Sequence, residues 1–301
     1  MKMKSVYSLL YPMDRHFFAL LLFFLLPVRT TASEVVAVLS SDLDAYREAL
    51  DGFTNTFGGS PSVTILASKT LPPVKSDTRL IVAFGGRAAA YSYPKNTPLI
   101  YCLSPGTIID PAERDAATVK IEMMPSPEVL SNRIALLSPP SGKIAVLWIA
   151  DVFSGYVADL TKRSTTNLAF VSKRMTSSDR LPETLREIHT QAQSIWLLPD
   201  PNLIKQDCFA TLKQFSLSNK IPLYVPTTTL VQKGAMGAVV ISFHDIGVTA
   251  GQTAHQLMKG ANVPPVVFPS NTQIHVNMET ANLISPENAQ AIQKNADKVY
   301  P

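Results

Sequence analysis

Residues 243–286 carry the most structural information in the chain, and they read FHDIGVTAGQTAHQLMKGANVPPVVFPSNTQIHVNMETANLISP. The apolar run 238–243 predicts a strand that leads directly into a helix. Gly247 and Gly251 are one turn apart, so one face of this helix carries no side chain and can press closely on a neighbour. Gly260 suits the left-handed cap that ends a helix. The segment therefore predicts a strand followed by a closely packed helix.

The second half of this segment predicts another strand and another helix. Pro264-Pro265 marks a turn, the run around 273–276 reads as a strand, and Asn277 begins a second helical run. The order resembles the closing segment of the ABC-transporter substrate-binding protein family, the exported group that includes tryptophan- and tyrosine-binding members. The matching positions of that family's I-x-V-N-x-x-T-A step are Ile274, Val276, Asn277, Thr280 and Ala281.

Three earlier pieces of the chain resemble the same family, so that the resemblance covers nearly all of residues 33–301. They are VVAVLSSDLDAYREALDGF (35–53), LIVAFGGRAA (80–89) and SIWLLPDPNLI (194–204). The resemblance implies a type I periplasmic-binding-protein-like fold, with two lobes around a hinge. It also implies capture of a small molecule and delivery to an ABC permease.

The apolar pattern independently predicts an α/β fold with two doubly wound parallel-sheet lobes. The strand candidates are continuous apolar runs, typical of strands buried on both faces, and they alternate with helices. The series restarts after the turn-rich link 138–142, and about 269 residues suit two lobes. We expect a leader at 1–32, lobes at 33–138 and 139–243, and a crossover segment at 244–301 that completes the lobes.

The N-terminus has the pattern of a cleavable signal peptide. Lys2, Lys4 and Arg15 precede the apolar run 17–28, whose 12 residues are few for a membrane span. The small residues 30–32 suit a cleavage site, and Met13 is an alternative start. A retained N-terminal anchor is the alternative interpretation. We expect periplasmic localisation, without a lipid anchor because no cysteine lies near the cleavage point.

Charge and cysteine usage argue against several classes of protein. Four basic residues and one acid lie in 1–32, which leaves 23 basic and 22 acidic groups of the 27 and 23 in the whole chain. We therefore expect no nucleic-acid partner. We also expect a monomer. Cys102 and Cys208 are far apart and each lies beside apolar residues, so two unpaired thiols are favoured over a disulfide. Five scattered histidines and no C-x-x-C predict no metal site and no cofactor.

Ligands of open parallel α/β sheets bind beyond the carboxyl ends of the strands, so we expect the binding residues at those positions. In the first lobe these are Ser40, Ser41, Asp42, Gly85, Gly86 and Ser104. In the second lobe and at the crossing they are Asp151, Asp200, Thr227, Phe243 and Asp245.

Most of these positions have a structural alternative. Ser41 and Asp42 can cap their helix as well as bind an anion. Gly85-Gly86 is a tight turn that also allows close approach of a ligand. Asp200 is either a turn former or the acceptor for a ligand amine or hydroxyl. Phe243 either stacks on an aromatic ligand or belongs to the core.

No motif indicates an enzyme. The chain has no G-x-S-x-G, H-E-x-x-H or Walker sequence, so we predict no catalytic residues. We predict an exported solute-binding protein for a small organic ligand, with an amino acid as one candidate. The alternatives are a periplasmic ligand-sensing module of a signalling receptor and an exported α/β enzyme.

Overall fold

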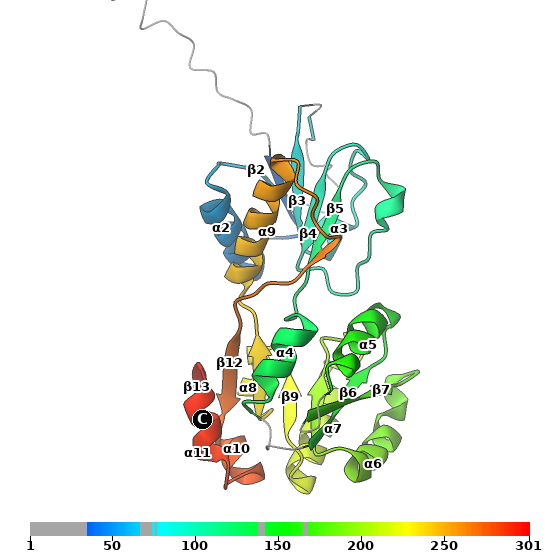
Figure 1. The fold of residues 1–301 in the computed structure, drawn as a ribbon, viewed down its shortest axis with the longest axis vertical. Helices are drawn as coiled ribbons and strands as arrows, with labels where there is room; N and C mark the ends of the chain where they lie inside the picture. The colour runs from blue at the N-terminus through cyan, green and yellow to red at the C-terminus, as the bar shows by residue number, and fades with distance from the viewer. Residues whose placement is uncertain (1–34, 67–73, 76, 138–141, 165–167) are drawn as a thin grey trace, which may run out of the picture. The chain divides into compact units, whose positions relative to one another are not determined.

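The structure, a computed structural model, describes residues 35–66, 74–75, 77–137, 142–164 and 168–301. Residues 33–301 form one compact unit. The predicted signal peptide and most of the predicted link 138–142 lie outside the described residues. The described part contains two sheets, shown with their helices in Figure 1.

The first sheet has six strands in the order β11-β5-β4-β3-β1-β2, and every pair is parallel. Its strands are β1 (Val35–Leu39), β2 (Ser62–Ile65), β3 (Leu80–Phe84), β4 (Leu99–Cys102), β5 (Thr118–Ile121) and β11 (Val266–Val267). Its helices are α2 (Asp44–Phe57), α3 (Gly86–Ala89) and α9 (Phe243–Met258). β1 and β3 are buried at every position, as their continuous apolar runs predict.

The second sheet has seven strands in the order β13-β12-β10-β9-β8-β6-β7. These are β6 (Gly142–Trp148), β7 (Leu168–Arg174), β8 (Ser194–Leu197), β9 (Leu223–Val225), β10 (Gly237–Val240), β12 (Gln273–Asn277) and β13 (Lys298–Tyr300). Only the β10–β12 pair is antiparallel among them. The accompanying helices are α4 (Pro127–Ile134), α5 (Ser154–Lys162), α6 (Leu181–Gln191), α7 (Gln206–Asn219), α8 (Thr228–Gln232), α10 (Met278–Ile284) and α11 (Ala289–Asn295). The two mainly parallel sheets with helices confirm the predicted fold class.

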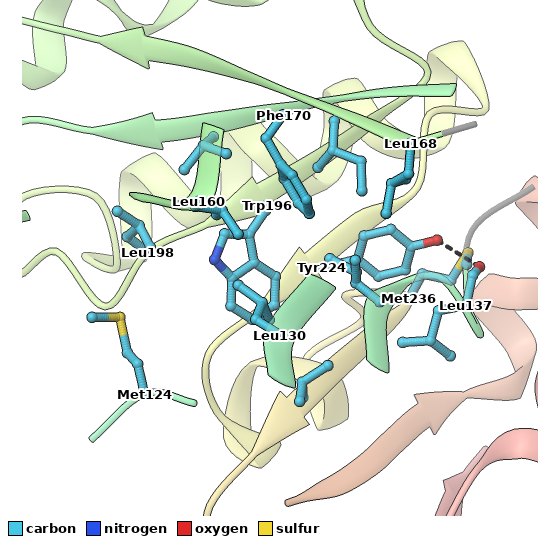
Figure 2. Packing of buried hydrophobic residues seen from close by; sticks show 14 of the residues in the cluster. Met124, Leu130, Leu137, Leu160, Leu168, Phe170, Trp196, Leu198, Tyr224 and Met236 are labelled. Carbon is cyan, nitrogen blue, oxygen red and sulfur yellow. Dashed lines mark hydrogen bonds between the residues drawn. The ribbon is translucent and has the colours of Figure 1, made fainter. Parts of the chain in front are cut away.

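Helix α4 belongs to the core of the second sheet, although it precedes the link at 138–142. Leu130 of α4 packs in one apolar cluster with Trp196 and Tyr224 (Figure 2). The Tyr224 hydroxyl donates a 2.6 Å hydrogen bond to the carbonyl of Leu137, just after α4. This bond satisfies a buried hydroxyl, and it fixes the end of the α4 segment against β9.

The chain passes between the sheets three times: after β5, after β10 and after β11. The segment 244–301 therefore contributes to both sheets, with α9 and β11 in the first and β12 and β13 in the second. Helices α2 and α9 lie side by side (Figure 1). A Cβ on Gly247 would lie 1.9 Å from the Ala49 carbonyl oxygen, and one on Gly251 would lie 2.8 Å from Thr56 Cβ. The prediction of a side-chain-free face against a neighbour is confirmed.

Candidate functional site

Ser40 and Gly85 meet at the carboxyl end of the first sheet, where they form a tight turn. Ser40 is buried, and its Oγ accepts a 2.8 Å hydrogen bond from the Ala88 amide. Gly85 has a φ of 97°, and a Cβ there would lie 2.5 Å from Ser40 Oγ and 2.7 Å from Tyr46 Oη. Glycine is therefore required by both the backbone conformation and the space. The contacts of these two residues are with the protein itself.

Ser41 and Asp42 lie closer to solvent. Helix α2 begins at Asp44, with Leu43 at the N-cap position and no side-chain capping bond. The alternative in which Ser41 or Asp42 caps this helix is therefore wrong. Asp42 is exposed and pairs with Arg47, whose hydrogen bond lowers the pKa of that carboxyl. Gly86, the first residue of α3, has space around it, since a Cβ there would meet only Thr107 Oγ1 at 3.8 Å.

Asp200 is fully buried, and its carboxylate holds two loops together. Oδ2 accepts hydrogen bonds from the amides of Ile149 (2.7 Å) and Ala150 (2.8 Å). Oδ1 accepts from the backbone amide of Asn202 at 2.9 Å and from its side-chain amide at 3.1 Å. Four protein donors surround the carboxylate, so the geometry favours the turn-forming interpretation over a ligand acceptor.

Asp151 lies at the exposed end of β6. Its carboxylate pairs with Arg174, whose guanidinium carbon lies 5.0 Å from the centre of the Trp148 ring. The three residues form a surface cluster of an ion pair and a cation–π contact. Arg174, at the end of β7, is a residue that the sequence-based selection of strand ends omitted.

Asp245 connects two of the passages between the sheets. Its Oδ2 accepts a 2.5 Å hydrogen bond from Ser242 Oγ, which in turn accepts a 3.0 Å bond from the Asp245 amide. Its Oδ1 accepts a 2.9 Å bond from Asn271 Nδ2. The Ser242 N-cap fixes the start of α9, and the Asp245 carboxylate ties it to the segment before β12.

Ser104 lines a small hollow with room of about 30 Å³. Its Oγ is buried and has no hydrogen-bond partner among the described residues. The ion pair of Lys120 and Glu122 lies in the same wall, and both side chains are largely buried. The Tyr156 hydroxyl donates a 3.0 Å bond to the Pro125 carbonyl, and burial raises the pKa of this phenol. The space suits a single water molecule.

A second hollow, of about 460 Å³, is large enough for a small organic ligand. It contains two of the predicted site residues, Thr227 and Phe243. Thr227 is the exposed N-cap residue of α8, and its hydroxyl makes no capping bond. Phe243 is 37% exposed at the start of α9. Met123 lines this hollow as well as the smaller one.

The larger hollow also includes residues that the sequence analysis missed. They are Glu48 on α2, Gln273 and His275 on β12, and Lys298 and Tyr300 on β13. Both His275 ring nitrogens are engaged, Nδ1 with Thr228 Oγ1 at 2.9 Å and Nε2 with Gln273 Oε1 at 3.0 Å. Burial lowers the pKa of His275, and the nearby Lys298 charge lowers it further. No local pattern marks β13, because it is a short, exposed edge strand.

The predicted residues thus divide into groups. Ser40, Gly85, Asp200 and Asp245 make structural contacts, while Ser104 and the pair Thr227 and Phe243 line separate hollows.

The structure shows both cysteines free, with Cys102 buried in β4, as the sequence analysis favoured. Across the described ranges, no group of three or more His, Cys, Asp or Glu residues is placed to hold a metal ion. No described helix combines the length and apolar character of a membrane span.

Comparison with known proteins places these features in a family. The ABC transporter substrate binding protein family matches residues 139–300. A tyrosine-binding protein of Clostridioides difficile (strain R20291) is 23% identical over 257 residues, which cover 79% of this chain and 71% of that protein.

Two solved structures share the fold. One is the ABC domain in complex with L-Trp from Streptococcus pneumonia, at 20% identity and a TM-score of 0.52, covering 88% of this chain and 100% of the other. The second is the ligand-free, open structure of a substrate binding protein with adhesive properties from Clostridium difficile. It has 16% identity and a TM-score of 0.58, and it covers 83% of this chain and 94% of the other. The chain therefore belongs to the ABC transporter substrate-binding protein family, whose members bind small molecules for ABC transporters and are not enzymes.

Proposed function

We propose that this protein captures a small zwitterion, with an aromatic amino acid as the first candidate, and delivers it to an ABC permease. The observation that carries the proposal is the hollow of about 460 Å³ around Thr227 and Phe243. It combines the aromatic ring of Phe243, the hydroxyl of Thr227, the cationic side chain of Lys298 and the anionic side chain of Glu48. Polar groups placed beside apolar surface are typical of small-molecule sites.

The choice of ligand class rests on the wall and on the relatives together. Phe243, Ile246 and Met123 offer apolar surface for a flat side chain. Glu48 and Lys298 offer opposite charges, as a zwitterion requires. One relative is named a tyrosine-binding protein, and one protein of similar fold was solved with L-Trp.

Capture would work by closure of the two lobes around the ligand. A ligand that contacts both lobes binds the closed form more tightly and shifts the population towards it. The permease would then recognise the closed form. Of the remaining strand-end positions, Ser41, Asp42, Gly86, Ser104 and Asp151 stay candidates for contacts made on closure.

The cellular setting is part of the proposal. Residues 1–32 would act as a cleavable signal peptide that exports the protein to the periplasm. The nearly balanced charge of residues 33–301 supports a protein that does not bind nucleic acid, and we propose that it acts as a monomer.

Thermal unfolding of residues 33–301 with and without single amino acids tests the function. A ligand at about 100 times its Kd stabilises a protein by about 2.7 kcal/mol, which for a chain of this size raises Tm by roughly 5–10 °C. We expect L-tyrosine or L-tryptophan to give such a shift. Tyramine and an unrelated sugar serve as controls. If no amino acid and no small organic acid changes Tm, the proposed function is wrong.

A further inference from the structure

The C-terminal strand β13 brings three neighbouring side chains to the larger hollow. β13 pairs with β12, and the register places Lys298 beside His275 and Tyr300 beside Asn277. Lys298 and Tyr300 are two residues apart on one strand, so their side chains point to the same side. Both line the hollow together with His275.

Tyr300 has a hydroxyl that the protein does not use. Its Oη is buried and has no hydrogen-bond partner among the residues that the structure describes. The ring lies 5.8 Å from the His275 ring, centre to centre. A buried hydroxyl without a partner is unfavourable, and most such groups in folded proteins find one. Because Oη itself is buried, a small movement of the ring towards the hollow on ligand binding would bring it to a ligand acceptor and satisfy it.

Lys298 supplies the positive charge in the part of the larger hollow that β13 lines. Its Nζ lies 5.4 Å from the centre of the Tyr300 ring, and the side chain is exposed. Lys298 takes no part in the ion pairs found within the described ranges. Both His275 ring nitrogens already have protein partners, Thr228 and Gln273, and burial lowers its pKa, so this ring is a weaker anion-binding group than Lys298. The ammonium of Lys298 is thus free to bind an anion.

We propose that Lys298 and Tyr300 form the carboxylate subsite of the larger hollow, with the Thr227 hydroxyl as a further donor. This inference rests on the proposed function and specifies how the ligand is oriented. The carboxylate binds at β13, and the apolar part of the ligand lies against Phe243. An ammonium and a phenol are both donors, which a carboxylate accepts as charge-assisted hydrogen bonds. Ligands without an acidic group lose this anchor.

Calorimetric titration of residues 33–301 with matched ligands tests the subsite. L-tyrosine and tyramine share the ring and the ammonium, and only L-tyrosine has the carboxylate. L-tryptophan and tryptamine form a second pair. We expect Lys298→Met to weaken binding of the amino acids on the order of 10- to 100-fold. Tyr300→Phe should weaken it by a smaller factor, and neither change should weaken amine binding. Lys294→Met, an exposed change on α11 outside the hollow, is the matched control.

The outcomes separate this inference from the proposed function. If the unaltered protein binds an amino acid and Lys298→Met binds it equally well, the subsite is wrong and the function stands. Equal affinity for L-tyrosine and tyramine would also overturn the subsite. If the unaltered protein binds no amino acid, the proposed function falls and the subsite falls with it. Each variant is checked for an unchanged Tm without ligand, which an exposed lysine should preserve.

Discussion

Gly247 is the position where the packing of α9 on α2 is most sensitive to a single methyl group. A Cβ on Gly247 would lie 1.9 Å from the Ala49 carbonyl oxygen and 2.8 Å from the Phe53 amide nitrogen. Both obstacles are backbone atoms, which cannot rotate away as a side chain can. Gly247→Ala would therefore force the two helices apart by about 1 Å, a form of overpacking.

The expected cost follows from two opposing effects. Overpacking of this kind costs about 1–3 kcal/mol, and a clash with backbone belongs at the upper end. Alanine in place of glycine returns about 1 kcal/mol through helix propensity. The net loss is about 2 kcal/mol, which should lower Tm by roughly 4–8 °C in a chain of this size. Urea unfolding followed by circular dichroism measures the same loss independently.

A graded series of alanine substitutions supplies the controls. A Cβ on Gly251 would meet the Thr56 side chain at 2.8 Å and the Phe53 carbonyl oxygen at 3.0 Å, so Gly251→Ala should cost less than Gly247→Ala. Exposed Gly155 in α5 has no neighbour within 4 Å, so Gly155→Ala should be neutral or stabilising by up to about 1 kcal/mol. If Gly247→Ala matched Gly155→Ala in stability, the reasoning from close backbone packing would be refuted.

Three other perturbations test single contacts. Asp200→Asn places a side-chain NH2 group, a donor, against backbone amides that now donate to the carboxylate. The free energy of unfolding should therefore fall by about 2–4 kcal/mol. An unchanged Tm would contradict a stabilising role of these hydrogen bonds. Burial raises the pKa of Cys102 whereas Cys208 is half-buried, so a thiol reagent should modify Cys208 alone in the folded protein and both after denaturation. Burial, and then the Lys298 charge, lower the pKa of His275, so its protonation favours the unfolded chain as the pH falls. The stability advantage of the unaltered protein over His275→Gln should therefore shrink between about pH 7 and about pH 5 in urea unfolding, and a constant difference would argue against the shift.

The order of strands and helices could be read from the sequence because it depends on local patterns. β1 and β3 coincide with the apolar runs that open VVAVLSSDLDAYREALDGF and LIVAFGGRAA. Buried parallel strands need an apolar side chain on both faces, and that requirement leaves a continuous run. The start of α2 was less predictable, because capping by Ser41 or Asp42 depends on the exact course of the preceding turn.

The larger hollow could be predicted only in part. Thr227 and Phe243 follow apolar strands, so the rule of strand ends finds them. Lys298 and Tyr300 belong to a three-residue edge strand that is defined only by its pairing with β12, and such a strand has no periodicity of its own. The same rule cannot tell where a side chain points: Asp200 and Thr227 both follow strands, yet Asp200 is fully buried and Thr227 is exposed.

The packing of α9 and the proposed ligand site are physically linked through Phe243. Phe243 is the first residue of α9 and lines the larger hollow, while Gly247 lies one turn further along the same helix. A shift of α9 away from α2 would therefore move the Phe243 ring relative to the rest of the wall. Gly247→Ala should then weaken ligand binding as well as stability, although Gly247 itself does not line the hollow. Asp200→Asn, which also lowers stability but lies outside the hollow and outside α9, should leave ligand binding unchanged. This contrast distinguishes displacement of the wall from a general loss of stability.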